Sequence, residues 1–361
     1  MRILGSCSPG EVRVVTLDGA GSEILDFGIW RPGAPDGVGD VHCGRVIARV
    51  PAMAGTFIAL GAAQGFLPDS EGGEGLGEGD TVSVRVTRAA QGGKGPRLSA
   101  APAGTPPAQG PGVLLELASQ YPEAPILVDD GAMAATLRPV LGERLRLAPR
   151  AFDPEIEEQV EALAGSDVEL AQGARLRIHP TPALVAIDID LGGALAAGRR
   201  KHATHLAANR ALLPALARQI RLRNLSGAIL VDLAGLPARR RMALTAALSD
   251  ALAKDPLRPR LLGFTRLGLA EIVRPRVHPP LHELLAGPHA AGLAALRRIA
   301  IETLARPHLL PVLRAAPEVV AALQADPEAL PDLARRTGRA LMMRSDPSVP
   351  SARWNIEYQD A

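Results

Sequence analysis

Two apolar stretches, LVAIDID at residues 184–190 and AILVDL at residues 228–233, decide the fold expected for this chain. In the first, the two-residue period of a strand puts Asp188 and Asp190 on one face and the aliphatic residues on the other. The second is a continuous apolar run, as expected for a strand covered on both faces. Between them, aliphatic residues recur at helical spacing over residues 213–220. The order strand, helix, strand predicts a βαβ unit with parallel strands.

Asp188 and Asp232 would then lie near the carboxyl ends of neighbouring strands, where open α/β sheets bind ligands. Carboxylates on apolar strands need a cationic partner, and a divalent metal ion is one candidate. The surrounding sequence is basic, with 16 Lys/Arg against 4 Asp/Glu over residues 199–276, which suits a polyanion held around a metal. Strand-end aspartates also commonly cap the following turn, and a basic stretch can be a solvated face, so both alternatives stay open.

The same region resembles the ribonuclease E/G family. RQIRLRNLSG at residues 218–227, followed by AILVD, is similar to the family signature, and ALVAIDID at 183–190 resembles its first catalytic strand. TRLGLAE at 265–271 and RPR at 274–276 match the next motif in order and spacing. The resemblance implies a ribonuclease-H-like catalytic domain in which Asp188 and Asp232 hold Mg²⁺ or Mn²⁺, with Asp190 as a further ligand or outer acceptor.

Residues 1–98 read as a β region, with strands expected at residues 11–17, 44–50, 56–61 and 81–86. They resemble the RNA-binding OB-fold barrel near the N-terminus of ribonuclease E/G proteins. Such barrels stack bases of single strands on aromatic rings beside cationic side chains. Phe57 and Phe66 stand at the family's aromatic positions, although both could equally be barrel core. The resemblance also assigns RNA contacts to Arg88, which replaces a lysine, and to Lys94, and Arg258 is expected to contact phosphate as well.

The organisation expected from the sequence is α/β and multidomain. A Pro/Gly/Ala-rich linker at 99–112 leads to the catalytic domain at 113–285, and a small α/β domain follows at 286–361. The C-terminal domain is expected to contain helices near 293–304 and 318–323 and a strand near 340–344. Family members insert a sensor for the 5′ monophosphate before the catalytic core, but this chain passes almost directly into the segment that follows it. We therefore expect no discrimination between RNA 5′ ends.

Several positions depart from the family pattern around the aspartates. Asp190 replaces an Asn, Gly235 replaces a second acid, Ala211 replaces a Glu, and His179 stands where an acid is usual. The arginines expected just after the first strand are absent from residues 191–196. These changes leave Asp188 and Asp232 in place but reduce the surrounding shell that orients metal and phosphate.

The cysteines that link family subunits through zinc are also absent. The chain has only Cys7 and Cys43, which form no CxxC, and His282 and His289 read as loop histidines without a third ligand. No zinc is expected, so the protein should be a monomer or a homodimer through apolar contacts of its C-terminal domain.

The composition agrees with a cytoplasmic location. The N-terminus lacks the basic-then-apolar pattern of a signal peptide, and no long apolar run suggests a membrane span. The net charge of +2 is small, so an RNA ligand is indicated by the uneven distribution of charge instead of its sum.

The sequence therefore predicts a metal-dependent endoribonuclease that cuts single-stranded RNA. A non-catalytic RNA-binding protein on the same scaffold is the alternative, supported by the departures around the aspartates. An α/β enzyme acting on a phosphorylated small molecule ranks last, because the chain has no Gly-rich phosphate loop at a strand–helix junction.

Overall fold

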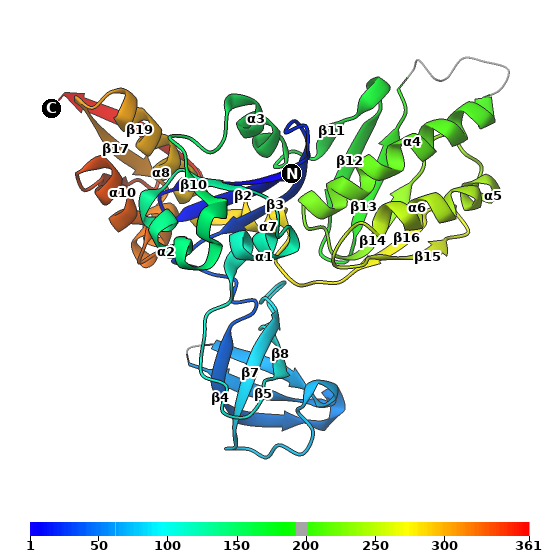
Figure 1. The fold of residues 1–361 in the computed structure, drawn as a ribbon, viewed down its shortest axis with the longest axis horizontal. Coiled ribbons are helices and arrows are strands. Elements are labelled where there is room, and N and C mark those ends of the chain that lie inside the picture. The colour runs from blue at the N-terminus through cyan, green and yellow to red at the C-terminus, as the bar shows by residue number, and fades with distance from the viewer. Residues whose placement is uncertain (62, 193–200, 361) are drawn as a thin grey trace. The chain divides into compact units, whose positions relative to one another are not determined.

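The computed structural model describes residues 1–61, 63–192 and 201–360. Its fold is mixed α/β with a closed five-stranded barrel toward the N-terminus, which confirms the expected fold class (Figure 1). The chain forms two compact units that cut across its linear order. One combines residues 1–37, 111–157 and 283–361, and the other combines residues 38–110 and 158–282. No helix in the described part of the chain is long and apolar enough to cross a membrane.

The first unit contains a five-stranded sheet in the order β10-β9-β1-β2-β3. The strands are β1 (Arg2–Ser8), β2 (Glu11–Leu17), β3 (Ile24–Trp30), β9 (Ile126–Val128) and β10 (Leu145–Leu147). The expected strand at 11–17 is thus confirmed, but it pairs within this sheet and not in the barrel. The helices of this part are α1 (Gly112–Gln120) and α2 (Gly131–Leu141), and α3 (Pro154–Ala162) begins in this unit and ends in the second. Side chains of α1 and α2 share one apolar core with the sheet.

The same unit has a three-stranded sheet, β18-β17-β19, packed against three helices. The elements are α8 (Gly287–Ala305), β17 (Leu309–Ala315), α9 (Pro317–Ala325), α10 (Ala329–Thr337), β18 (Met342–Ser345) and β19 (Trp354–Asp360). The two helices and the strand expected in this part are confirmed. The expectation of loop histidines was wrong: His282 lies in α7 (Leu281–Leu284), and His289 lies in the first turn of α8. The ring of His289 contacts buried Asp326 at 2.8 Å, so this histidine stabilises local structure.

A buried ion-pair network joins α8 to the five-stranded sheet. Glu11 is almost completely buried, with one carboxylate oxygen 2.9 Å from Arg31 and the other bonded to Arg297. Burial by itself raises the pKa of the Glu11 carboxyl, but attraction to Arg297 and Arg31 outweighs it and the pKa is lowered. The network explains why polar residues are tolerated between these elements, since buried charges require paired, hydrogen-bonded partners.

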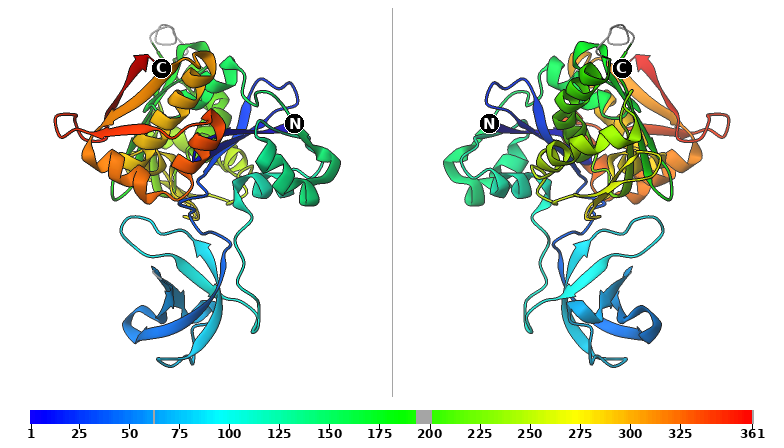
Figure 2. Two further views of the ribbon diagram at one scale, coloured as in Figure 1. Left: turned by 90° about the vertical axis from the view of Figure 1, so that its left-hand side faces the viewer. Right: turned by 90° about the vertical axis from the view of Figure 1, so that its right-hand side faces the viewer.

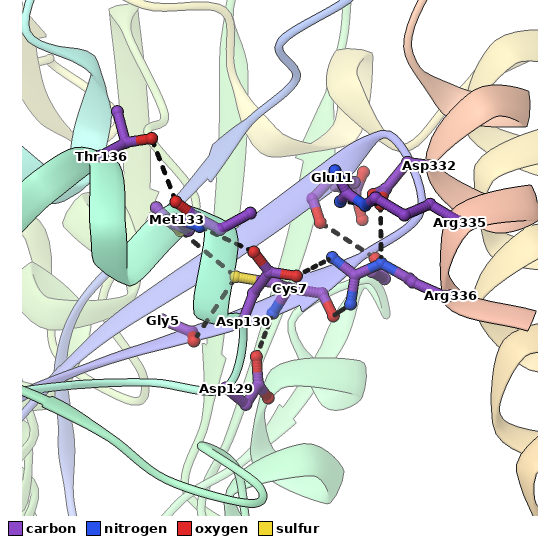
Figure 3. Close-up of polar contacts among 12 residues, drawn as sticks. Gly5, Cys7, Glu11, Asp129, Asp130, Met133, Thr136, Asp332, Arg335 and Arg336 are labelled. Atoms are coloured by element: carbon purple, nitrogen blue, oxygen red, sulfur yellow. Dashed lines mark hydrogen bonds and ion pairs between the residues drawn. The ribbon is translucent and has the colours of Figure 1, made fainter.

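A second polar cluster holds α10 against β1 and α2 (Figure 3). Asp129 accepts a hydrogen bond from the Cys7 backbone at 2.7 Å, and Asp130 caps α2 through the Met133 backbone at 2.8 Å. Arg336 lies 2.8 Å from Asp130 and also contacts Asp332. Burial, reinforced by the charges of Asp129 and Asp130, raises the pKa of the Cys7 thiol. The thiol is therefore protonated at neutral pH, and this cluster is structural.

The two cysteines are expected to differ in reactivity toward a thiol reagent. Cys43 is exposed, whereas Cys7 is partly buried with a raised pKa, and only the thiolate attacks. In the native protein at pH 7.5 to 8, Cys43 should be labelled rapidly and Cys7 only after unfolding, as measured by labelling followed by peptide mass spectrometry. The variant C43S should show almost no fast labelling. Rapid modification of Cys7 in that variant would contradict the buried environment.

The barrel, drawn in blue and cyan in Figures 1 and 2, belongs to the second unit. Its strand order is β4-β5-β6-β8-β7, as in OB-like barrels. Its strands are β4 (Val41–Val50), β5 (Gly55–Leu60), β6 (Ala63–Pro68), β7 (Thr81–Arg88) and β8 (Arg97–Ala100). Aliphatic side chains from every strand fill the interior: Val46, Ile58, Leu67, Val84, Val86 and Leu98. The strands expected from residue 44 onward are confirmed.

The second unit also contains a six-stranded sheet in the order β11-β12-β13-β14-β16-β15. Its strands are β11 (Asp167–Glu169), β12 (Arg175–Pro180), β13 (Val185–Asp190), β14 (Gly227–Asp232), β15 (Arg260–Phe264) and β16 (Ala270–Arg274). The expected βαβ unit is confirmed: β13 and β14 are parallel and joined through α4 (Lys201–Leu222). Helix α4 and α6 (Thr245–Leu252) pack on one face through a single apolar core, with α5 (Ala238–Arg241) between β14 and α6.

Candidate active site and nucleic-acid interface

Asp188 and Asp232 lie directly beside each other at the ends of two parallel strands. Their Cα atoms are partners in the β13–β14 register, so both side chains leave the same face of the sheet. Adjacent strands are about 4.8 Å apart, which brings the carboxylates within reach of one small ligand. Both side chains are about half exposed, at 50% and 51%. The pairing inferred from strand order is thus present, and it faces solvent.

The described side chains of α4 and α6 pack against the opposite face of the sheet, and we call the face that carries this pair the open face. Val185, Ile187 and Ile189 of β13 are buried on the opposite, helix-covered face, as the alternating sequence predicts. The expectation for β14 was wrong, because Ala228 is exposed and only one face of this strand is buried. Within the run AILVD, Ile229 and Val231 fill the core, whereas Ala228 is exposed and Leu230 only half-buried on the other face.

Two arginines approach the aspartates from neighbouring elements. Arg177 lies opposite Asp188 on β12, with the guanidinium 3.8 Å from the carboxylate. Arg241 lies 2.5 Å from Asp232 and is itself only 11% exposed. Its guanidinium also donates to the backbone carbonyls of Leu236 and Gly268, at 2.8 and 3.0 Å. These bonds fix Arg241 in place, so Asp232 is held by a preorganised cation and does not cap the next turn.

The motif TRLGLAE shapes the turn that positions Arg241. Thr265 accepts a hydrogen bond from the Leu269 backbone at 3.1 Å, which closes the turn before β16. Gly268 has a positive φ of 89°, and a Cβ there would lie 2.9 Å from Ala238 and 3.1 Å from the Arg241 side chain. Only glycine lets this turn approach α5 so closely. The motif therefore acts on the site through Arg241.

Asp190 follows Asp188 on the open face and is exposed. One of its oxygens accepts a hydrogen bond from the Gly192 backbone at 2.9 Å. Across residues 1–61, 63–192 and 201–360, no three His, Cys, Asp or Glu side chains gather closely enough to hold a metal ion. The donor set is thus two carboxylates side by side. It fits Mg²⁺ or Mn²⁺, which often bind through one or two carboxylates and take their remaining ligands from water and substrate phosphates.

The structure gives a physical reason for Gly235, where the family has an acid. Gly235 has φ +64°, and a Cβ at this position would lie 1.9 Å from the ring nitrogen Nδ1 of His205. That nitrogen is 3.1 Å from the Gly235 carbonyl, and His205 is buried on α4. Asn209, one turn later, donates to the carbonyls of His205 and Ala234. The histidine occupies the space that a side chain at position 235 would need.

Restoring an acid at this position is therefore expected to destabilise the protein. In Gly235→Asp, placing a side chain on left-handed backbone should by itself lower the free energy of unfolding by about 1–2 kcal/mol. The overlap with His205 should lower it further. The double variant Gly235→Asp/His205→Ala should recover the part due to overlap and remain less stable than the wild type. Thermal unfolding of the three proteins measures both contributions. Equal stability of the single and double variants would show that the histidine does not limit this position.

The signature at residues 218–227 is mainly structural. Arg223 is buried and donates to the carbonyls of Leu163 and Gly165, which fixes the chain after α3. Burial lowers the pKa of its guanidinium to about 10. Asn224, with φ +47°, donates to the carbonyls of His278 and Pro279, and its side-chain oxygen accepts from Arg274 at 2.6 Å. Arg223 and Asn224 thus hold neighbouring backbone segments in place just before β14 begins, away from the aspartates at its end.

In the barrel, Phe57 and Phe66 lie outside the apolar interior. They are partners in the β5–β6 register, and their rings meet edge to face with centroids 5.4 Å apart. Both are half-buried, and neither belongs to the interior cluster. A Cβ on Gly55 would meet the Phe66 ring at 2.4 Å, so this glycine leaves the space in which the ring lies. The barrel-core alternative for the two rings is not supported, and their stacking on bases stays a prediction.

The three cations expected to contact RNA occupy different surroundings. Arg88 ends β7 and is half-buried, whereas Lys94 is exposed in a tight Gly92–Gly93 hairpin closed by reciprocal backbone bonds between Gln91 and Lys94. Both glycines have positive φ, as a two-residue hairpin turn requires. Arg258 is exposed in the turn before β15, with φ +50°. In the strand register Arg88 pairs with Arg97, which in turn pairs with Phe66, and the RNA role of all three cations stays a prediction.

Sequence reasoning missed Arg177 and Arg241, two cations that contact the aspartates. A signal for Arg241 was present, since the run of three arginines at 239–241 follows Asp232 by only a few residues. No comparable signal existed for Arg177, because its proximity to Asp188 depends on the antiparallel register of β12 and β13.

Comparison with known proteins identifies relatives of the part of the chain that contains β13 and β14. The model of the Ribonuclease E/G family matches residues 136–277, a range that includes Asp188, Asp232 and Arg241. Ribonuclease E of Escherichia coli is 32% identical over 175 residues, which are 47% of this chain and 15% of that protein. A chloroplastic ribonuclease E/G-like protein of Arabidopsis thaliana is 33% identical over 151 residues, 41% of this chain and 15% of its own length. Ribonuclease G of Escherichia coli is 33% identical over 132 residues, 36% of this chain and 27% of that protein. The matched part thus spans only a minor fraction of each relative.

Proposed function

Because residues 136–277 belong to the ribonuclease E/G family, we propose that this protein is an endoribonuclease that cleaves single-stranded RNA at the Asp188–Asp232 pair. The observation that carries the proposal is the register of β13 and β14, which sets two half-exposed carboxylates side by side on the open face. The matched family region contains both strands, so homology and geometry point to the same place.

In this proposal Asp188 and Asp232 hold Mg²⁺ or Mn²⁺. When bound, the ion supplies activation of a water molecule and stabilisation of the charge that develops on the scissile phosphate. Asp190, directed to the same face, accepts hydrogen bonds from groups around the pair. Arg177 and Arg241 attract the RNA backbone and orient both carboxylates before the substrate arrives.

RNA capture is assigned to the barrel and to basic side chains of the catalytic region. Phe57 and Phe66 stack on unpaired bases, while Arg88, Lys94 and Arg258 contact phosphates. The half-buried, outward rings support this assignment. We also propose a monomer or a homodimer through the C-terminal part, where Ile301, Leu304 and Met342 are exposed at 59%, 75% and 59%. Because the chain passes from β8 into α1 with few intervening residues, the protein should ignore the RNA 5′ end.

A non-catalytic RNA-binding protein is the second candidate, and one observation favours it. Asp232 is already bonded to Arg241 at 2.5 Å, and this arginine is fixed by two backbone carbonyls. A metal would have to share Asp232 with this cation, in a site of only two carboxylates.

Purified protein with an end-labelled single-stranded oligoribonucleotide separates the two candidates. Cleavage with Mg²⁺ that EDTA abolishes supports the endoribonuclease. Tight binding with the RNA left intact over hours, with either Mg²⁺ or Mn²⁺, overturns catalysis and supports the binding protein. The variant Asp188→Asn serves as the control against a contaminating nuclease.

A further inference from the structure

The outer surface of the barrel carries one continuous row of side chains across four strands. Phe57 on β5 pairs with Phe66 on β6, Phe66 pairs with Arg97 on β8, and Arg97 pairs with Arg88 on β7. Residues paired across strands share a face, so two rings are followed by two guanidinium groups. All four side chains are half-buried. We call these four residues the cross-strand row.

A β-bulge brings Arg88 into this row. Val86 pairs with Leu98, and both side chains are buried in the barrel interior. With regular alternation, Arg88 would share the inward face of Val86. The register shifts between Val86 and Arg88, so that Arg88 pairs with outward-facing Arg97 instead. Bulges commonly redirect a side chain at a functional surface, and this one places a second cation beside the first.

A third arginine approaches from the segment that follows β16. The backbone N–H of Ala89 donates to the Val277 carbonyl at 2.8 Å, and the Gln91 side chain donates to the same carbonyl at 3.2 Å. These bonds hold the residue after Arg88 next to the residue after Arg276. Burial, followed by repulsion from Arg97 and Arg276, lowers the pKa of the Arg88 guanidinium. Among the residues that the structure describes, no carboxylate forms an ion pair with any of these three arginines.

Arg276 also lies beside Gly227, the first residue of β14. Its guanidinium fills the position of a Cβ on Gly227, at 2.5 Å, and Gly227 has φ +81°. Asp232 lies five residues further along the same strand, a distance of about 16 Å at roughly 3.3 Å per residue. The arginine cluster, meaning Arg88, Arg97 and Arg276, therefore lies away from the candidate chemistry and can only position a substrate. Arg97 and Arg276 are not among the RNA-contacting residues assigned above.

We propose that Arg97 and Arg276 join Arg88 in binding consecutive phosphates of a single RNA strand whose unpaired bases stack on Phe57 and Phe66. This inference rests on the proposed function. It specifies which residues bind the RNA strand between the barrel and the six-stranded sheet. Three unneutralised cations held together repel one another, and a polyanion removes that repulsion. Adjacent aromatic rings select single strands, because only unstacked bases can lie on them. The cluster contributes affinity without sequence preference, since phosphates carry no base identity.

The test measures RNA binding in EDTA, so that cleavage plays no part. Binding of a fluorescent single-stranded oligoribonucleotide is followed between about 50 and 200 mM KCl for the wild type, Arg97→Gln, Arg276→Gln and the control Arg45→Gln. Arg45 is exposed on β4 of the same barrel and outside the cross-strand row. Each cluster variant should reduce the magnitude of the negative slope of log K against log salt by about 0.7, the value for one single-strand phosphate contact. Arg45→Gln should retain the wild-type slope, and Arg97→Lys should restore most of it.

Two further readouts separate binding from a structural role. Without RNA, Arg97→Gln and Arg276→Gln should melt at or above the wild-type temperature, because each removes repulsion. With Mg²⁺, both should raise KM and leave kcat unchanged. Wild-type slopes in both variants, or equal affinity of the wild type for duplex and single-stranded RNA, would overturn this inference while leaving the endoribonuclease intact. Failure of the wild type to bind RNA would overturn both, whereas binding with these slopes but no cleavage would overturn catalysis alone.

Discussion

Replacing Asp188 or Asp232 by Asn is expected to slow RNA cleavage by about 100- to 1,000-fold, because a metal site is worth several kcal/mol to the transition state and each 1.4 kcal/mol is about tenfold in rate. The amide keeps the size of the side chain and removes the charge that would hold the ion. Both positions are about half exposed, so the substitution should have little effect on stability. RNA affinity in EDTA should change little, since the carboxylates are not part of the proposed RNA-binding surface.

The double variant gives the sharper result. If the two aspartates hold one ion, Asp188→Asn/Asp232→Asn should be no slower than the worse single variant by more than a few-fold, because residues that act as a unit are not additive. Asp250→Asn is the matched control, since Asp250 is exposed on α6 within the same unit. Undiminished cleavage in both single variants would contradict the assignment of the site.

Asp255→Ala is expected to lower the free energy of unfolding by about 3–5 kcal/mol, the usual cost of removing one partner from a buried ion pair. Asp255 and Arg274 are 5% and 4% exposed, with Nε and the carboxylate 2.7 Å apart. Without the carboxylate, Arg274 keeps the Asn224 side chain and the Leu225 carbonyl as its acceptors within the described part of the chain. The RPR motif would then contribute stability through its first arginine and RNA binding through its last.

Urea unfolding measures this effect, and Asp250→Ala provides the surface control within the same helical region. Below its unfolding transition, Asp255→Ala should bind RNA with the same salt dependence as the wild type. Arg276→Gln should instead have wild-type stability and a weaker salt dependence of RNA binding. A stability loss under about 1 kcal/mol would show that Arg274 is adequately satisfied by its remaining partners.

The family resemblance carried most of the functional prediction, and the structure shows where it was informative. The signature at 218–227 is recognisable because Arg223 and Asn224 must satisfy buried carbonyls, which restricts their identity. The same motif contributes no side chain to the aspartate pair at which cleavage is proposed. The departures around the aspartates looked like losses from the sequence, yet Gly235 is a requirement imposed by the ring of His205.

The sequence by itself determined the mixed α/β fold, the parallel β13–β14 pair, the barrel strands and the face on which Asp188 lies, because these follow from local hydrophobic period and short connections. Only the tertiary structure decided that β14 is covered on one face, that Arg241 binds Asp232, and that Phe57, Phe66, Arg97 and Arg88 form one row. These features depend on strand register, on a one-residue bulge and on contacts between distant segments. A single-residue shift in register reverses every side chain of a strand, and no local pattern in this sequence encodes that choice.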